Sequence, residues 1–448
     1  MLRLALTYLF RRPVQLLAIL GVAVGLLALL SVLAVMNGLI GMNTEAIRGP
    51  LGDLMLIPAV SEELPRWDDY APALMDAPGV EAVAPHLVAY AMFSFPGYIV
   101  DLSDTRQSDH SGIQIIGIDY EAERKVNNFA MELEQARGLP VQDPDAPFAK
   151  DPGNIFARPT VLVSDAFASY LPTDPDGGRT RMELGALPAV LPPAGEALVP
   201  HNARVEVGGT FGGSDFRSAM DRVYMTRTGR DGLHYNLLGS AAADFTEALI
   251  KLEEGVDPEV AKEAILASLA RAGLPRPGGD QGGILQTWQE RSSLVLHAIH
   301  NERRVVTLVM FFIVVVAAFG LFATLSTLVR EKIRDLGILA AVGYSPLRRG
   351  MLMLTTGGVA SALGCLLGYL GAYQLVEHRK AIEDWVDQQF GVRVFQPDLY
   401  VVDGLPAEWN DGEAIALTFL TLGVGLLFTA APALRAALFP PVKALRYE

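Results

Sequence analysis

The stretch VREKIRDLGILAAVGYSPLRRG, from Val329 to Gly350, lies between two long apolar segments. Its apolar residues fall near helical spacing, while the rest of it is strongly charged. It holds two acidic residues, Glu331 and Asp335, and five basic ones: Arg330, Lys332, Arg334, Arg348 and Arg349. A loop this short that is both charged and amphipathic suggests a folded element at a membrane surface.

Four segments are long and apolar enough to cross a membrane, which takes about 20 residues. We predict spans at 14–36, 305–329, 351–376 and 414–434. The first could instead be a signal peptide, but its apolar run is longer than such a peptide needs and no convincing cleavage site follows, so we expect an uncut anchor. The chain has 448 residues, is 51% hydrophobic and has a mean hydropathy of +0.29, which fits a few spans plus a large water-facing domain.

Basic residues near the span ends predict the orientation. The tail 1–13 carries Arg3, Arg11 and Arg12 without an acid, and the loop 330–350 has five bases against two acids. The loop 377–413 has nine acids and three bases. We therefore expect the tail 1–13, the loop 330–350 and the tail 435–448 in the cytoplasm, and the domain 37–304 and the loop 377–413 outside.

The outer domain is predicted to be mixed α/β and to form two lobes. Alternating and β-branched runs at 80–95 and 112–119 indicate strands. A further strand near 245–252 precedes a helix with Asp257 as N-cap and Pro258 at its first position, ending near Gly273.

The sequence offers no set of catalytic residues. G-x-S-x-G and H-E-x-x-H motifs are absent, and His297 and His300 make at most half a metal site, better explained as part of a stalk before the second span. The single cysteine, Cys365, excludes an internal disulfide, and the net charge of −14 argues against non-specific nucleic-acid binding. We expect no catalytic, metal or cofactor site in this chain.

Two sets of small residues call for an explanation within the spans. Gly364 and Gly368 form a small-xxx-small face that allows close helix packing, within the chain or between subunits. Asn37 and Gly38 lie where the first span leaves the membrane. Gly38 is predicted either to end that helix or to form a flexible junction with the outer domain.

For the loop itself, we expect a helix with Ile333, Leu336, Ile338 and Leu339 on its apolar side. Gly343 should end it, and Ser345 and Pro346 should begin the next helix. Three roles are open: an interfacial helix, a simple topology signal, or a rigid element that docks into a soluble partner.

Several motifs resemble FtsX/MacB-type ABC transporter permeases, in particular the lipoprotein-releasing (LolC/LolE) branch. The loop resembles the coupling-helix region of these permeases at Val329, Lys332, Asp335, Gly337, Ile338, Leu339, Gly343 and Ser345, with Leu336 where isoleucine is usual. Similar matches are Val35–Gly38 at the end of the first span, Trp288 and Glu302 in the stalk, and the terminal Pro441, Ala444, Leu445, Arg446, Tyr447 and Glu448. The outer domain shows only a general likeness.

This resemblance implies a membrane α-helical permease with one span before, and three after, a MacB-like periplasmic α/β domain. A separate ATPase, in two copies, would bind ATP and Mg²⁺, since the chain has no G-x-x-x-x-G-K-[ST] sequence. A second permease chain would complete the dimer in a bacterial inner membrane. The ATPase would dock on Arg330, Lys332, Asp335, Leu336, Ile338, Leu339, Gly343, Ser345 and Pro346.

The function implied is mechanotransmission from the ATPase, without hydrolysis by this chain, to extract lipoproteins and pass them to a carrier. Two alternatives belong to the same superfamily: MacB-like efflux or peptide export with an adaptor, and FtsX-like regulation of a periplasmic cell-wall hydrolase. A membrane-anchored enzyme is disfavoured because no catalytic set is visible.

Overall fold

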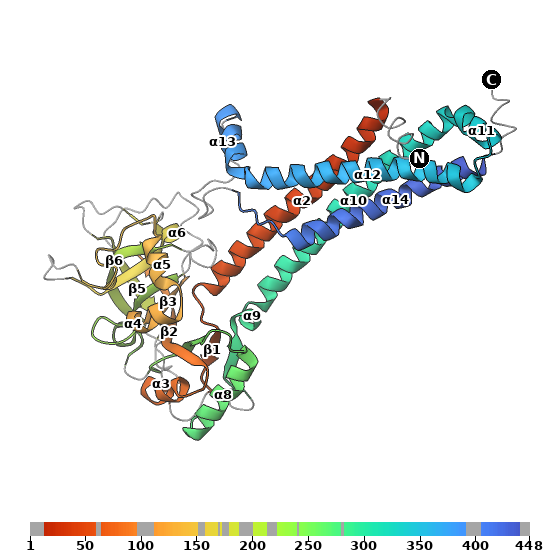
Figure 1. Cartoon of the computed structure of the whole chain (residues 1–448). Helices are drawn as coiled ribbons and strands as arrows, with labels where there is room; N and C mark the ends of the chain where they lie inside the picture. The colour runs from red at the N-terminus through yellow and green to blue at the C-terminus, as the bar shows by residue number, and fades with distance from the viewer. Residues whose placement is uncertain are drawn as a thin grey trace, which may run out of the picture. The chain divides into compact units, whose positions relative to one another are not determined.

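The computed structural model describes residues 13–59, 64–95, 112–150, 157–168, 171–172, 179–187, 200–212, 222–239, 242–278, 282–390 and 405–439. The chain divides into two compact units, a helical unit (1–42, 297–397 and 402–448) and an outer unit (43–296 and 398–401). The predictions for Arg3, Arg11, Arg12 and the terminal motif at Pro441 to Glu448 lie outside the described residues. Figure 1 shows the elements of both units.

Four long helices of the helical unit are apolar enough to cross a membrane. They are α2 (Pro13–Arg48), α10 (Ser293–Glu331), α12 (Pro346–Glu377) and α14 (Asp411–Leu438). All four extend beyond the apolar segments recognised in the sequence. Two shorter helices follow α10 and α12: α11 (Ile333–Ala341) and α13 (Arg379–Phe390), which leaves the end of α12 at a steep angle (Figure 1).

Glycines let the spanning helices approach closely. A Cβ at Gly364 would lie 2.8 Å from Val22 Cβ, and a Cβ at Gly368 would lie 2.7 Å from Ala23 O, both on α2. On another part of α12, a Cβ at Gly350 would lie 3.1 Å from Ala437 Cβ on α14. Glycines at these contacts therefore let the helix backbones approach closely. Within a membrane this close packing holds helices together, because the hydrophobic effect does not drive them to associate. The two glycines of the predicted face thus pack within the chain, against the first span.

The outer unit is built on a mixed sheet. Among the residues that the structure describes, this sheet has nine strands. Its order is β3-β7-β4-β6-β5-β2-β8-β1-β9, and β3 also pairs with β2. The strands are β1 (Leu54–Ile57), β2 (Val80–Ser94), β3 (Gly112–Ile118), β4 (Thr160–Ser164), β5 (Arg181–Ala186), β6 (His201–Phe211), β7 (Arg222–Thr226), β8 (Glu247–Leu252) and β9 (Ile284–Thr287).

The long strand β2 belongs to two subregions. Its first half pairs with β8 from Val80 to His86, while its second half pairs with β3 on one edge and with β5 on the other. The β2–β3 pairing closes six strands into a ring, whose interior holds a core that includes Ile115, Val163 and Val205. A separate core lies under β1 and β8. All nine strands belong to one sheet within one compact unit, so the expectation of two lobes stays a prediction.

Short helices cover the sheet. They are α3 (Trp67–Met75), α4 (Tyr120–Val126), α5 (Phe129–Glu134), α6 (Asp165–Ala168), the π-helix η1 (His234–Leu238), α8 (Pro258–Arg271) and α9 (Trp288–Arg291). The predicted cap of α8 is confirmed: Asp257 Oδ1 accepts a hydrogen bond from Glu259 N at 2.8 Å, with Pro258 at the first position. Ala261 and Ile265 lie on its buried face, whereas Val260 is exposed.

Candidate functional site

The first candidate site is the turn between α10 and α12, formed by α11 and the residues after it. Helix α10 ends at Glu331 and α11 starts at Ile333, with Lys332 between them. Lys332 Nζ pairs with Asp335 Oδ2 at 2.9 Å, across the first turn of α11. Gly343 has φ +97°, a conformation that glycine adopts without a Cβ penalty, so the helix ends as predicted. Ser345 then caps α12 through Arg348 N, and Pro346 follows at its first turn.

One side of α11 packs onto the ends of the spanning helices. Leu336 is 1% exposed and lies in a cluster with Leu328 and Val329 of α10 and Met353 of α12, and Leu339 packs against the same cluster. This packing fixes α11 to two spans at once.

The opposite side of the turn carries apolar residues on the surface. Ile338, Val342 and Leu347 are 48%, 74% and 76% exposed, and every residue from Ala341 to Arg348 is exposed. Of the predicted apolar side of this helix, Leu336 is therefore buried against the spans, whereas Ile338 is exposed. Val342 and Leu347 were missed in the sequence because they flank a chain reversal at Gly343 rather than continuing the helical repeat.

Basic residues border this surface, which we call the knob (338–348). Arg330 and Arg334 are exposed, and so is Arg348. Arg349, counted with them in the sequence, is instead 5% exposed. Its guanidinium donates to Phe439 O at 3.1 Å and to Ala437 O at 3.2 Å, and so satisfies carbonyls at the end of α14. An apolar patch with cations beside it is suited to docking a protein or to lying in lipid headgroups.

The second candidate site lies at the other end of the spans, around Asn37 and Gly38. Helix α2 continues ten residues past Gly38 to Arg48, so the prediction that Gly38 ends the helix is wrong. A Cβ at Gly38 would lie 2.6 Å from both Ala407 N and Pro406 C, backbone atoms that precede α14. Glycine is required here by close backbone approach rather than by a helix end.

Asn37 belongs to a polar cluster that joins three helices. Its Nδ2 donates to Glu413 Oε2 of α14 at 3.0 Å. Arg303 of α10 binds both oxygens of the same carboxylate, at 2.7 and 2.8 Å. We call these three residues the clasp. The sequence contained no signal for it, because its members lie up to 376 positions apart.

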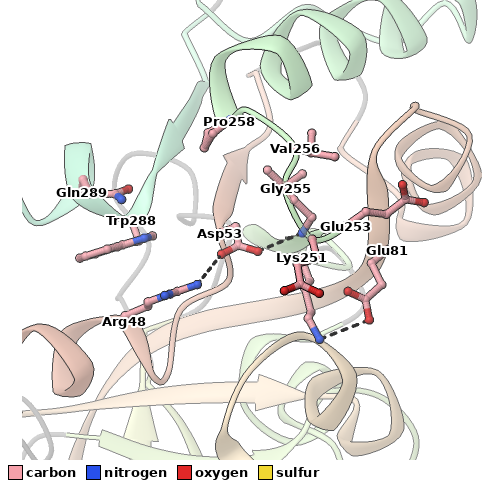
Figure 2. Close-up of a pocket in the computed structure, with 12 residues that line it drawn as sticks. Arg48, Asp53, Glu81, Lys251, Glu253, Gly255, Val256, Pro258, Trp288 and Gln289 are labelled. Carbon is pink, nitrogen blue, oxygen red and sulfur yellow. Dashed lines mark hydrogen bonds and ion pairs between the residues drawn. The ribbon is translucent and has the colours of Figure 1, made fainter.

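Part of the outer unit forms a pocket of about 560 Å³ (Figure 2). Trp288 lies across it from Lys251 and Glu81, which pair at 3.3 Å. Arg48 pairs with Asp53 at 3.3 Å, and the same carboxylate accepts a hydrogen bond from Leu252 N. The pocket thus lies where the end of α2 and the start of α9 meet strands β1 and β8, and its basic groups are already bound by carboxylates.

A buried polar pair lies deeper in the outer unit. His86 Nε2 lies 2.8 Å from Glu123 Oε2, and both residues are buried. Burial opposes protonation of His86, but the Glu123 carboxylate outweighs it and raises the pKa of the imidazole. Nearby, burial raises the pKa of Glu132 to about 7. These groups couple the stability of the outer unit to pH. We found no cluster of three or more metal-ligating side chains within the described part of the chain.

Comparisons with known proteins agree with this division of the chain. A model of the MacB-like periplasmic core domain matches residues 16–268, and a model of the FtsX-like permease C-terminal region matches residues 307–441. The lipoprotein-releasing system transmembrane protein LolC of Neisseria meningitidis is 24% identical over 98% of this chain and 95% of its own length.

Other relatives align over less of their length. The LolC protein of Xylella fastidiosa is 26% identical over 37% of this chain, and the chain spans only 40% of that relative. The solved periplasmic region of MacB from Actinobacillus actinomycetemcomitans covers 55% of this chain and 94% of its own, at 11% identity and a TM-score of 0.30. That score is too low to add to the family assignment, which comes from the sequence models.

Proposed function

Because the chain belongs to the MacB-like periplasmic core domain family and carries an FtsX-like permease C-terminal region, we propose that it is the membrane subunit of an ABC transporter that releases lipoproteins. In this proposal it spans a bacterial inner membrane four times, with both termini in the cytoplasm and the outer unit in the periplasm. It extracts acylated proteins from the outer leaflet and passes them to a soluble carrier. The full-length similarity to a lipoprotein-releasing LolC protein supports the choice of substrate.

The knob is the observation that carries this proposal. It holds three exposed apolar side chains beside cations: Ile338 on α11, Val342 directly after it and Leu347 at the start of α12. The short helix α11 packs directly onto two spans. A topology signal needs only the positive charge, and an interfacial helix would not need a chain reversal at Gly343. A rigid docking element needs both an exposed surface beside positive charge and a chain reversal that presents this surface. We assign the docking partner as a separate ATPase, present in two copies, which binds the ATP and Mg²⁺.

Helix α10 is suited to carry motion away from the knob. It is continuous for 39 residues, which corresponds to about 58 Å of helix. ATP-driven closure of the two ATPases would shift α11, and α10 would carry that shift toward the outer unit. ATP drives this change only through its different affinity for the two states of the complex, so the permease itself needs no catalytic group. The complete transporter would contain a second permease chain, identical or related.

Affinity purification of the chain from its native membrane, followed by mass spectrometry, tests the proposal. We expect a small ATPase and acylated proteins to co-purify with it. A matched purification of the Val342→Glu variant should retain the acylated proteins and lose the ATPase, because Val342 lies on the exposed side of the knob.

Other outcomes separate the alternatives. An ATPase with an outer-membrane channel or adaptor would assign the chain to MacB-like efflux, and an ATPase with a cell-wall hydrolase to FtsX-like regulation. The absence of any ATPase in the wild-type purification would contradict the role assigned to the knob.

A further inference from the structure

A groove lies beside the clasp, between α10 and α14, with α2 as its floor. Its volume is about 510 Å³, within the range of small-molecule sites. Apolar side chains line most of it: Leu29 from α2, Leu308 and Phe311 from α10, and Leu417 from α14. Arg303 and Arg304 line it as well. The groove therefore combines an apolar channel with a cationic end.

The position of the groove along the helices matches one leaflet of a bilayer. Its arginines directly precede Val305, the first residue of the uncharged segment of α10. From Arg304 to Phe311 the helix rises about 10 Å. The cationic end thus lies at the boundary of the hydrocarbon, on the side where α10 leads to the outer unit, and the apolar walls follow the depth of the acyl chains.

The two arginines at the cationic end differ in whether a carboxylate neutralises them. Glu413 neutralises Arg303 through two short contacts and is further held by Asn37. Arg304 is exposed and makes no ion pair with the residues that the structure describes. Arg303, Arg304 and Glu413 together carry one net positive charge. A phosphodiester that bears a single negative charge would cancel it and could accept hydrogen bonds from Arg304.

We propose that this groove binds one anionic phospholipid of the adjacent leaflet. Its phosphate lies at Arg304, and an acyl chain lies along Leu308 and Phe311. The clasp keeps Arg303 and Glu413 paired, so Arg304 alone sets the preference for an anionic headgroup. The site is separate from the transported substrate, and its existence does not depend on the proposed function, because lipid binding can be measured without transport.

Native mass spectrometry of the purified full chain, titrated with phosphatidylglycerol or phosphatidylethanolamine, tests this proposal. The wild type should retain phosphatidylglycerol preferentially. Arg304→Gln should weaken that binding about tenfold, as expected for the loss of a charge-assisted hydrogen bond, while Arg304→Lys should keep most of it. Leu308→Trp should fill the groove and reduce binding of both lipids.

A matched control is available on the same helix. Phe312 is 58% exposed and Leu308 is 56% exposed, but only Leu308 lines the groove, so Phe312→Trp should bind lipid as the wild type does. Thermal unfolding of each variant checks that it is folded.

Four results would overturn the proposal. The first is unchanged phosphatidylglycerol binding by a folded Arg304→Gln variant. The second is equal binding of the two lipids by the wild type. The third is one-for-one displacement of phosphatidylglycerol by a triacylated lipopeptide, which would assign the groove to the substrate. A lipid-free dimer whose groove residues cross-link to the second copy would likewise replace the lipid with a protein neighbour.

Discussion

Loss of the apolar side chains of the knob should weaken ATPase binding by an amount that the structure allows us to work out. Complete burial of a Val, Leu or Ile side chain contributes about 1.5–3 kcal/mol. Val342 and Leu347 are about three-quarters exposed and Ile338 about half, so covering them would contribute about 1–2 kcal/mol for each of the first two and about 1 kcal/mol for Ile338. The three together would contribute at most about 5 kcal/mol.

We therefore expect Val342→Ala to raise the Kd for the ATPase about fivefold to tenfold, since 1.4 kcal/mol corresponds to a factor of ten. Val342→Glu should have a larger effect, because it also places a carboxylate in a desolvated contact. The assay is binding of the purified ATPase to the full chain in lipid nanodiscs, with the permease immobilised.

Leu336→Ala provides the matched comparison on the buried side of the same helix. It should lower the thermal stability of the permease, by about 2–5 kcal/mol in unfolding free energy, because it opens a cavity in the packing of α11. Leu336→Ala should change the Kd for the ATPase only to the extent that it loosens the packing of α11. If Val342→Glu left the Kd within twofold of the wild type, the knob could not be the main docking surface.

Three further results are expected. A double-mutant cycle of Arg303→Gln and Glu413→Gln should give a coupling energy of about 1–2 kcal/mol in thermal unfolding, since the pair is partly buried. A coupling energy near zero would mean that the clasp does not hold its helices together. Gly38→Ala should destabilise the chain by about 1–3 kcal/mol, because its Cβ would overlap the backbone before α14, while Gly21→Ala, with open space around it, should be neutral or stabilising. Equal effects of the two variants in the unfolding assay would contradict this account. Burial raises the pKa of Glu132 from 4.5 to about 7, so its contribution to stability is complete below the unfolded pKa and is lost as pH rises through the folded pKa. Tm should therefore fall between about pH 4.5 and pH 7, Glu132→Gln should remove part of that fall, and an unchanged slope in the variant would contradict it.

Local pattern was enough to predict some of the regular elements of the chain. The four apolar segments, the strands at 80–95 and 112–119, and the helix capped by Asp257 all follow from residue periodicity and capping preferences between neighbours in sequence. The α11 turn was also predictable, because Gly343, Ser345 and Pro346 determine the backbone locally.

Contacts between distant residues could not be predicted in the same way. Nothing near Asn37 indicates that Glu413 accepts its hydrogen bond, and nothing near Gly38 indicates the approach of Ala407. The division of β2 between two sets of partners likewise depends on strands far along the chain. Helical periodicity identified the apolar side of α11 but could not show that the neighbouring spans cover Leu336 and leave Ile338 exposed.

ATP-dependent release of an acylated protein tests the central claim most directly. The full chain would be reconstituted in proteoliposomes with its ATPase, any partner permease chain, a fluorescent lipoprotein and a soluble carrier. We predict that the lipoprotein moves to the carrier with ATP and stays in the membrane with a non-hydrolysable analogue or with the Val342→Glu permease. ATP hydrolysis without any release, while the same vesicles export a soluble peptide, would contradict the claim.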